Sequence, residues 1–165
     1  MQTQTAFCRV ASRMLMALAV VLLLGGCAIS TPFPQLKEAP GVGSEEKVVV
    51  VLTHIVVDSN QRNEFDRQTR RVIDSLPSQR GMLGYSARIQ LFGNEAWTMS
   101  VWAEDTDRAG FVRSAVHQEA IVKSAPAIVS IQLKRLTLAR KNIPESWPRA
   151  LELLAEPSDL RTYGQ

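Results

Sequence analysis

Two histidines, His54 and His117, are the side chains of this 165-residue chain best suited to move a proton near neutral pH. The reference pKa of an imidazole is about 6.5, so it can accept a proton from a phenolic or enolic group. His54 lies late in an apolar run, and we expect Arg88, Ser86 and Ser100 to flank it across a sheet. His54 is therefore either a general base or a hydrogen-bonded structural residue. A packing or capping role is favoured for His117.

Tryptophan is the second residue type with chemical use here, because an indole can stack on a flat ligand. We expect Trp97 to pack beneath helices and Trp102 to face a cavity. Ligand contact and plain core filling are equal alternatives for Trp102. Arg88 could pair with an anionic group of a ligand or with an acid of a partner subunit. Together with Ser86 and Ser100, it forms the predicted ligand-binding set.

Several other chemistries find no support in the sequence. Zinc ordinarily needs three or four close ligands, which two histidines without a neighbouring acidic or thiolate set do not supply. We therefore predict no metal site and no cofactor. The sequence has no Gly-rich phosphate loop, no Ser-centred nucleophile elbow and no paired-carboxylate arrangement. Nucleotide, ester and glycoside hydrolysis are accordingly not expected.

Composition indicates one ordinary folded domain with 45% apolar residues. The formal charge is +3, but the first 26 residues contain Arg9 and Arg13 and no acid. Without them, the balance is 17 basic against 16 acidic residues, or +1. A nearly neutral domain has no long basic field from which counterions could be released, so we predict no nucleic-acid partner.

The N-terminus has the pattern of a secretory signal. Residues 14–24 are eleven consecutive apolar residues, which at about 1.5 Å each are too short for a hydrocarbon core of roughly 30 Å. An uncleaved anchor is therefore the weaker interpretation. The stretch Leu24-Gly25-Gly26-Cys27 resembles the bacterial lipoprotein box, in which the cysteine is lipidated and the chain is cleaved before it. This resemblance implies a signal peptide over residues 1–26 and a membrane anchor on Cys27.

The same resemblance places the mature protein in the cell envelope. Ala28 follows Cys27 and no Asp stands at that second position, which in a diderm cell suggests the periplasmic face of the outer membrane. Cys8 is removed with the signal, and Cys27 is capped by lipid. The mature chain is then left without a thiol for disulfides or cysteine catalysis.

Proline, glycine and hydrophobic periodicity divide the rest of the chain. Residues 27–46 contain prolines and glycines without a helical or strand period and are predicted to be a flexible tether. Residues 47–142 form the folded domain, and residues 143–165 form a C-terminal helix and tail. Within the domain, we expect strands over 47–57, 85–91, 96–102 and 129–138, and helices over about 58–76 and 105–125. A change of alternation predicts a β-bulge near Lys134 and Arg135.

This order is β-α-β-β-α-β, the ferredoxin-like arrangement of the α+β class. Both helices then pack on one face of the sheet. The other face would carry Val50, Leu52, His54 and Trp102, a large apolar patch if left in water. We therefore expect a second copy of the chain to cover it, giving a homodimer built as a dimeric α/β barrel.

Two stretches of the domain resemble the dimeric α+β barrel family of antibiotic-biosynthesis monooxygenases, which also contains haem-degrading monooxygenases. They are Trp97-Thr98-Met99-Ser100-Val101-Trp102-Ala103-Glu104-Asp105 and Phe111-Val112-Arg113-Ser114-Ala115-Val116-His117. The resemblance spans roughly residues 47–142. It implies oxidation of aromatic molecules or haem by dioxygen, often without a metal or flavin, in a cavity with a Trp on the third strand and an Asn on the first.

Trp102 matches the tryptophan of that family, but His54 occupies the position of its asparagine. The iron-ligating histidine of haem-degrading members falls near Ile121, not on His117, so haem cleavage through that ligand is not expected. The functional prediction is a membrane-anchored lipoprotein that oxidises a small hydrophobic or aromatic molecule with dioxygen, with Trp102 positioning the substrate and His54 moving a proton. The alternative is a non-catalytic ligand-binding or structural envelope lipoprotein.

Overall fold

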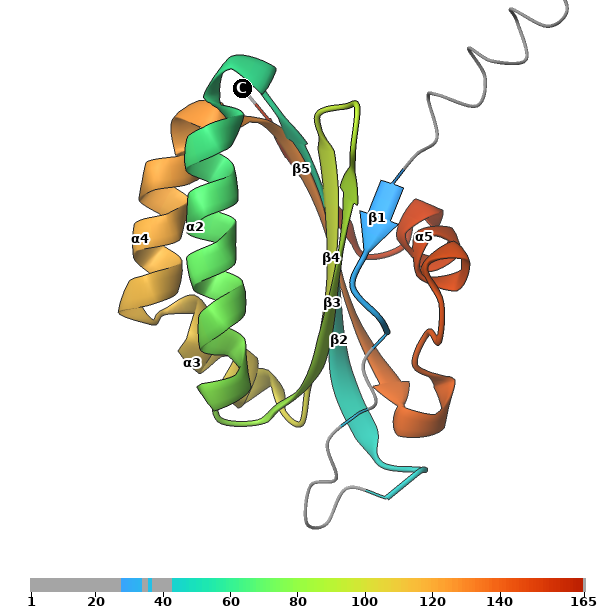
Figure 1. Ribbon diagram of the computed structural model, residues 1–165. Coiled ribbons are helices and arrows are strands. Elements are labelled where there is room, and N and C mark those ends of the chain that lie inside the picture. The colour runs from blue at the N-terminus through green and yellow to red at the C-terminus, as the bar shows by residue number, and fades with distance from the viewer. Residues whose placement is uncertain (1–27, 34–35, 37–42, 165) are drawn as a thin grey trace, which may run out of the picture.

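A computed structural model describes residues 28–33, 36 and 43–164 of the chain. The predicted signal and Cys27 lie outside the described residues. Six antiparallel strands form one sheet in the order β1-β3-β4-β2-β5-β6 (Figure 1). The strands are β1 (Ala28–Ser30), β2 (Lys47–Val57), β3 (Met82–Gln90), β4 (Glu95–Trp102), β5 (Ile128–Ala139) and β6 (Leu160–Gly164). The helices are α2 (Arg62–Ser75), α3 (Asp105–Val112), α4 (Ala115–Ser124) and α5 (Trp147–Ala155), with short 3-10 turns at Ser59–Gln61, Leu76–Ser78, Ala125–Ala127 and Arg140–Asn142.

The four central strands confirm the ferredoxin-like α+β fold. β2 pairs with β4 on one side and with β5 on the other, while β3 lies outside β4. Strand β2 is apolar on both sides because both of its faces are covered. Val48, Val50 and Leu52 are at most 1% exposed and belong to one core cluster, whereas Val49 packs in another on the opposite face.

Helices α2, α3 and α4 cover one face of the sheet (Figure 1). The single helix predicted over 105–125 is two helices, because Ser114 has an extended backbone and starts α4 by accepting a hydrogen bond from the backbone N–H of His117 at 3.4 Å. Glu119 of α4 pairs with Arg71 of α2 at 2.9 Å. Hydrogen bonds from Arg71 and Lys123 lower the pKa of Glu119 to about 2, so its carboxylate stays ionised and links the two helices.

The opposite face of the sheet is covered by the chain's own C-terminal helix. Trp147, Ala150 and Leu154 of α5 are buried against β2, and Phe33 packs edge-on against Trp147 with 5.5 Å between ring centroids. This corrects the expectation of a bare face that needs a second copy as its cover. The homodimer therefore stays a prediction that the apolarity of this face does not by itself require.

The predicted bulge near Lys134 and Arg135 is wrong, since β5 pairs with β2 in continuous register through both residues. The register shifts at Val56/Val57 instead. The alternation changes along β5 because its two halves are buried on different faces. Leu136 and Leu138, in the second half of β5, pack in the core beside α5. Ile131 and Leu133, in the first half, line the space beneath α2 and α4.

Lys134 is the buried residue that joins β5 to α5. Its side chain is fully buried, and Nζ donates hydrogen bonds to the carbonyl oxygens of Leu153 at 2.6 Å and Glu156 at 3.0 Å. These carbonyls belong to the C-terminal end of α5, where orphan acceptors and the negative end of the helix dipole favour a cation. The ammonium group therefore fixes α5 on the sheet.

Two segments outside residues 47–142 extend the sheet. β1 pairs with β3 from Ala28 onward, and Thr31 donates its backbone N–H to the carbonyl of Ala87 at 2.9 Å. The first residues after Cys27 are thus part of the sheet, which corrects the flexible tether predicted there. β6 pairs with β5 where a polar tail was expected. Within the described part of the chain, no helix is both long and apolar enough to cross a membrane.

Candidate functional site

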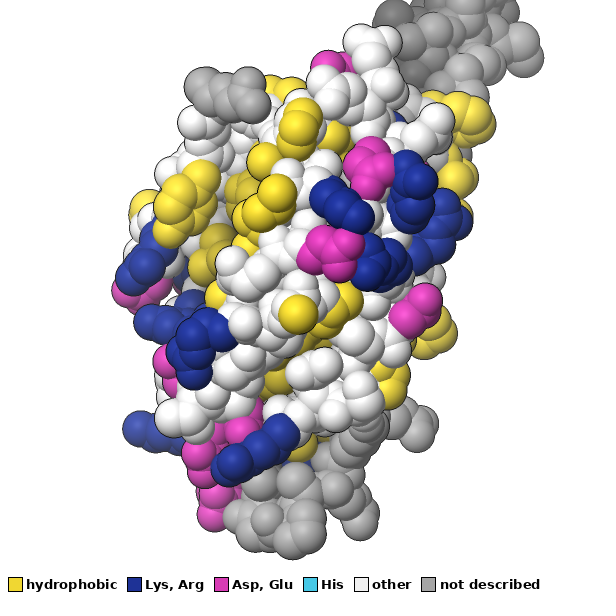
Figure 2. All heavy atoms as spheres, turned by 90° about the vertical axis from the view of Figure 1, so that its left-hand side faces the viewer, with side chains coloured by type: hydrophobic (Ala, Val, Ile, Leu, Met, Phe, Trp, Pro, Cys, Tyr) yellow, Lys and Arg dark blue, Asp and Glu magenta, His cyan; other side chains and the backbone are white. Residues whose placement is uncertain are grey.

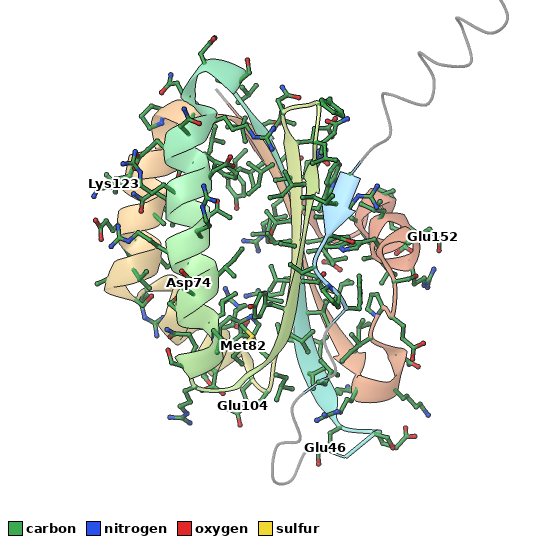
Figure 3. The ribbon with its side chains drawn as sticks, in the orientation of Figure 1. Glu46, Asp74, Met82, Glu104, Lys123 and Glu152 are labelled. Atoms are coloured by element: carbon green, nitrogen blue, oxygen red, sulfur yellow. The ribbon has the colours of Figure 1, made fainter. Side chains whose placement is uncertain are left out.

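A cavity of about 780 Å³ lies between the sheet and its three-helix layer. In Figure 3, side chains from α2 and from the sheet point toward each other across this layer, whereas Asp74 of α2 and Lys123 of α4 point to solvent. The walls are largely apolar and come from all four central strands, α2 and α4; they include Val51, Ile55, Phe65, Val72, Ile89 and Leu133. A volume of this size lies in the range of small-molecule sites.

The cavity reaches the surface beside α4 and β6. Ile121 and Tyr163 both line it and are 47% and 55% exposed, so they mark its mouth. Figure 2 shows hydrophobic side chains at the surface of this helical side between groups of charged ones. The same region of the lining also contains Asp159 and Arg161, so the mouth combines apolar and charged side chains.

His117 is the titratable imidazole of the cavity wall. Its ring packs edge-on against Phe111 with 4.7 Å between centroids, and its Nδ1 is buried without a hydrogen-bond partner. Burial lowers the pKa of His117, and a hydrogen bond with the backbone of Val112 opposes part of that shift. The imidazole is therefore neutral at pH 7 and can accept a proton. The packing role predicted for His117 is present, but the sequence did not indicate its place in a cavity.

A cationic group lies in the same cavity. Arg108 and Arg135 both line it and both contact Asp105, with Arg108 Nε at 2.6 Å and Arg135 Nη1 at 3.2 Å from its Oδ1. The hydrogen bond from Arg108 is the largest cause that lowers the pKa of Asp105. The two guanidinium groups share one carboxylate, so this part of the wall suits an electron-rich oxygen of a ligand.

Trp102 lies on the cavity side of the sheet, under the helices. It is 1% exposed, its Nε1–H donates to Ser100 Oγ at 3.0 Å, and its ring lies 5.2 Å from that of Phe111. The expectation that Trp102 shares the opposite face with Val50 is wrong, because Val50 pairs with Val101 and cross-strand partners point to the same face.

His54 lies on the other face, which α5 partly covers. Its Nε2 is 2.6 Å from Glu95 Oε2, and its Nδ1 is 3.4 Å from Gln132 Oε1. The ring stacks on Trp97 with 4.9 Å between centroids and an interplanar angle of 4°. Trp97 therefore packs here and not beneath the helices. His54 and Trp102, the predicted catalytic pair, are separated by the sheet.

The predicted ligand-binding residues divide in the same way. The guanidinium carbon of Arg88 lies 5.6 Å from the centre of the Trp97 ring, and Ser86 donates a hydrogen bond to the carbonyl of Thr31 at 3.1 Å. Both are on the face of His54. Ser100 is on the cavity face, where it accepts the hydrogen bond from Trp102. The structure therefore brings Ser100 and Trp102 together and places His54, Arg88 and Ser86 on the other face of the sheet.

No group of three or more His, Cys, Asp or Glu side chains that could hold a metal ion occurs among the residues described.

The comparisons with known proteins find similarity to solved structures but none to family models or curated sequences. A candidate antibiotic-biosynthesis monooxygenase from Bacteroides thetaiotaomicron aligns with TM-score 0.54 and 14% identity, covering 63% of this chain and 100% of its own. A candidate monooxygenase from Lactobacillus acidophilus aligns with TM-score 0.51 and 17% identity over 68% of this chain, which spans about half (51%) of that protein. A similar protein from Nitrosomonas europaea gives TM-score 0.50 at 13% identity, covering 60% of this chain and 94% of its own. At these identities the comparisons show a shared fold.

Proposed function

We propose that this protein binds a small hydrophobic, aromatic molecule in the cavity beneath α2 and α4 and oxidises it with dioxygen. The observation that carries the proposal is a cavity of about 780 Å³ with apolar walls and the imidazole of His117 in its lining. Candidate monooxygenases with the same fold support the class of reaction.

The chemistry that suits this wall is the oxidation of a phenol. The imidazole of His117 accepts the phenolic proton, and the resulting phenolate gives up electrons to dioxygen more readily than the neutral phenol does. A phenol and one dioxygen give a quinone and one water, so the substrate supplies all the electrons. Arg108 and Arg135 lie in the same lining and suit the phenolate oxygen.

We also propose that the mature protein is a lipoprotein of the cell envelope, anchored through Cys27. The support is the Leu24-Gly25-Gly26-Cys27 sequence after an apolar stretch of signal length. In a diderm host, the absence of Asp after Cys27 favours the periplasmic face of the outer membrane. A homodimer is part of the same proposal, and sedimentation at micromolar concentration tests it by the mass of the particle.

A non-catalytic binding protein is the second candidate. One observation favours it. The indole N–H of Trp102 already donates a hydrogen bond to Ser100, and its ring packs on Phe111, so Trp102 fills the core as well as lining the cavity. Such a protein would retain a hydrophobic molecule without consuming dioxygen.

The test is oxygen uptake with a panel of phenols and hydroquinones, using a variant that fills the cavity. Ala120 on α4 is buried and lines the cavity, so Ala120→Phe should block it. Ala115→Phe places the same ring on the exposed side of the same helix and is the matched control. Uptake by the wild type and the control, lost in Ala120→Phe, supports oxidation in the cavity. Equal uptake in all three would place the reaction elsewhere, and binding without uptake would favour the second candidate.

A further inference from the structure

The turn that joins β3 to β4 carries exposed hydrophobic side chains at one end of the sheet. Phe92 is 78% exposed and Leu91 is 48% exposed. Ile29 of the neighbouring strand β1 is 57% exposed and pairs with Ile89, two residues before Leu91. We call Ile29, Leu91 and Phe92 the tip patch. The ring of Phe92 belongs neither to the core nor to the cavity wall, and exposed apolar patches of this kind often mark a contact site.

The tip patch is held firmly in place. Arg62, at the start of α2, donates hydrogen bonds to the carbonyl of Gly93 and, at 3.3 Å, to that of Gln90. The backbone N–H of Val57 donates to the carbonyl of Asn94 at 2.8 Å. These contacts tie the turn to the helix layer and to the central strand, so Leu91 and Phe92 are presented on a fixed support.

The mature chain enters the fold at this same end. Ala28, the first residue after Cys27, pairs with Gln90, the last residue of β3 before Leu91. The sheet therefore begins one residue after the predicted lipidation site, and no spacer separates that site from the turn. In Figure 1, β1 begins on the side of the sheet that is nearer the β3–β4 turn. Glu46 and Glu104 lie at the opposite end (Figure 3).

We propose that the tip patch inserts into the lipid bilayer to which the chain is anchored, and so fixes the domain upright on the membrane. This inference rests on the proposed lipidation of Cys27. The lipid brings the turn to the surface, and the apolar side chains then sink about 5–10 Å into the boundary between headgroups and acyl chains. The Glu104 end of the molecule points away from the membrane.

The contact is apolar and does not depend on surface charge. The charged groups that flank the turn already have partners, because Glu95 pairs with His54 at 2.6 Å and Arg62 pairs with Asp66 at 3.5 Å. Attraction of a basic patch to anionic lipid falls steeply with added salt, whereas burial of hydrocarbon does not. The effect of added salt on membrane contact therefore distinguishes an apolar contact from an electrostatic one.

The experiment uses the full chain, processed in bacteria and purified as the mature protein, with a cysteine at position 92. Both native cysteines are unavailable, since Cys8 leaves with the signal and Cys27 carries the lipid, so Phe92→Cys provides the one free thiol. It is labelled with a fluorophore and reconstituted into phosphatidylethanolamine and phosphatidylglycerol vesicles that contain acyl-chain nitroxide quenchers. Ser78→Cys is the matched control, because Ser78 is exposed and follows α2 at its far end, about 20 Å from Arg62 at 1.5 Å per residue.

We expect nitroxides to reduce the fluorescence of the label at 92 and not that at 78, equally at low salt and at high salt. Equal quenching at both positions, or quenching that disappears at high salt, would overturn the insertion of the tip patch. Intact mass of the same samples reports the lipid on Cys27. A mature chain without the lipid mass would refute the anchor itself and the docking that depends on it, which keeps the two failures apart.

Discussion

The chemical character of His117 follows from its position one turn into α4. Ser114 starts that helix, and the imidazole is then packed on Phe111 within an apolar cavity. His54 lies on the far side of the sheet, where Glu95 and Gln132 contact both of its ring nitrogens.

We therefore predict that His117→Gln lowers dioxygen-dependent turnover by about 10²–10⁴-fold, the usual contribution of a general base. His54→Gln is the control, since it replaces the other histidine of the chain, and it should leave turnover within the error of the wild type. Steady-state rates of the wild type and both variants on one phenol from the panel measure this difference. Loss of activity only in His54→Gln would move the base to the opposite face.

The same histidine predicts a pH dependence of stability. Burial lowers the pKa of His117 in the folded state, so the unfolded chain binds the proton more readily. The free energy of unfolding should fall as pH drops through the unfolded pKa of about 6.5, and the loss levels off below the folded pKa. His117→Gln removes this contribution. Urea unfolding between pH 7.5 and pH 5 should show a smaller decrease for the variant, and parallel curves would contradict the assignment.

The sequence predicted the faces of β2 correctly but not those of the tryptophans, and the reason is register. Alternation fixes which residues of one strand share a face, and it correctly grouped Val50, Leu52 and His54. Relating two strands requires their pairing, which a single sequence does not contain. Trp97 and Trp102 differ by an odd number of positions, so one error of register exchanges them between the core and the cavity.

At the scale of elements, Lys134 holds the C-terminal helix on the sheet. Lys134→Met keeps the length of the side chain but leaves the carbonyls of Leu153 and Glu156 without their charged donor. We expect a loss of about 1–3 kcal/mol in the free energy of unfolding, the cost of such unsatisfied groups. Lys141→Met is the control, because Lys141 is exposed and pairs with Glu45 at the surface. Denaturant titration of both variants measures the difference, and equal stability would argue against this role of Lys134.

Hydrophobic periodicity predicted most of the helices and strands. It failed where a single side chain determines the end of a helix. Apolar periodicity correctly indicated a helix over about 58–76, where α2 lies. The division between α3 and α4 depends on the hydroxyl of Ser114, which a smooth apolar pattern over 105–125 conceals. The hydrophobicity of the second face shows that something must cover it. The sequence pattern does not show that α5 is the cover, because α5 contacts β2 across a long distance in the chain.

At the scale of the whole molecule, the sheet separates two different environments. α5 packs against one face and covers part of it, while the other face, beneath α2 and α4, lines the cavity. The tip patch and the start of β1 lie together at one end of this sheet. Under the proposed anchoring through Cys27 and insertion of the tip patch, a hydrophobic substrate dissolved in the bilayer would be close to the domain.

The proposed function requires the cavity between the sheet and the helices to hold a small hydrophobic molecule. Native mass spectrometry of the mature protein, extracted gently from the bacterial envelope, tests it most directly. We predict an additional small-molecule mass on the wild type and on Ala115→Phe, and none on Ala120→Phe, whose new side chain occupies the cavity. The same spectrum reports whether the particle is a dimer. A wild-type protein with no retained mass, or one retained equally by Ala120→Phe, would contradict the claim.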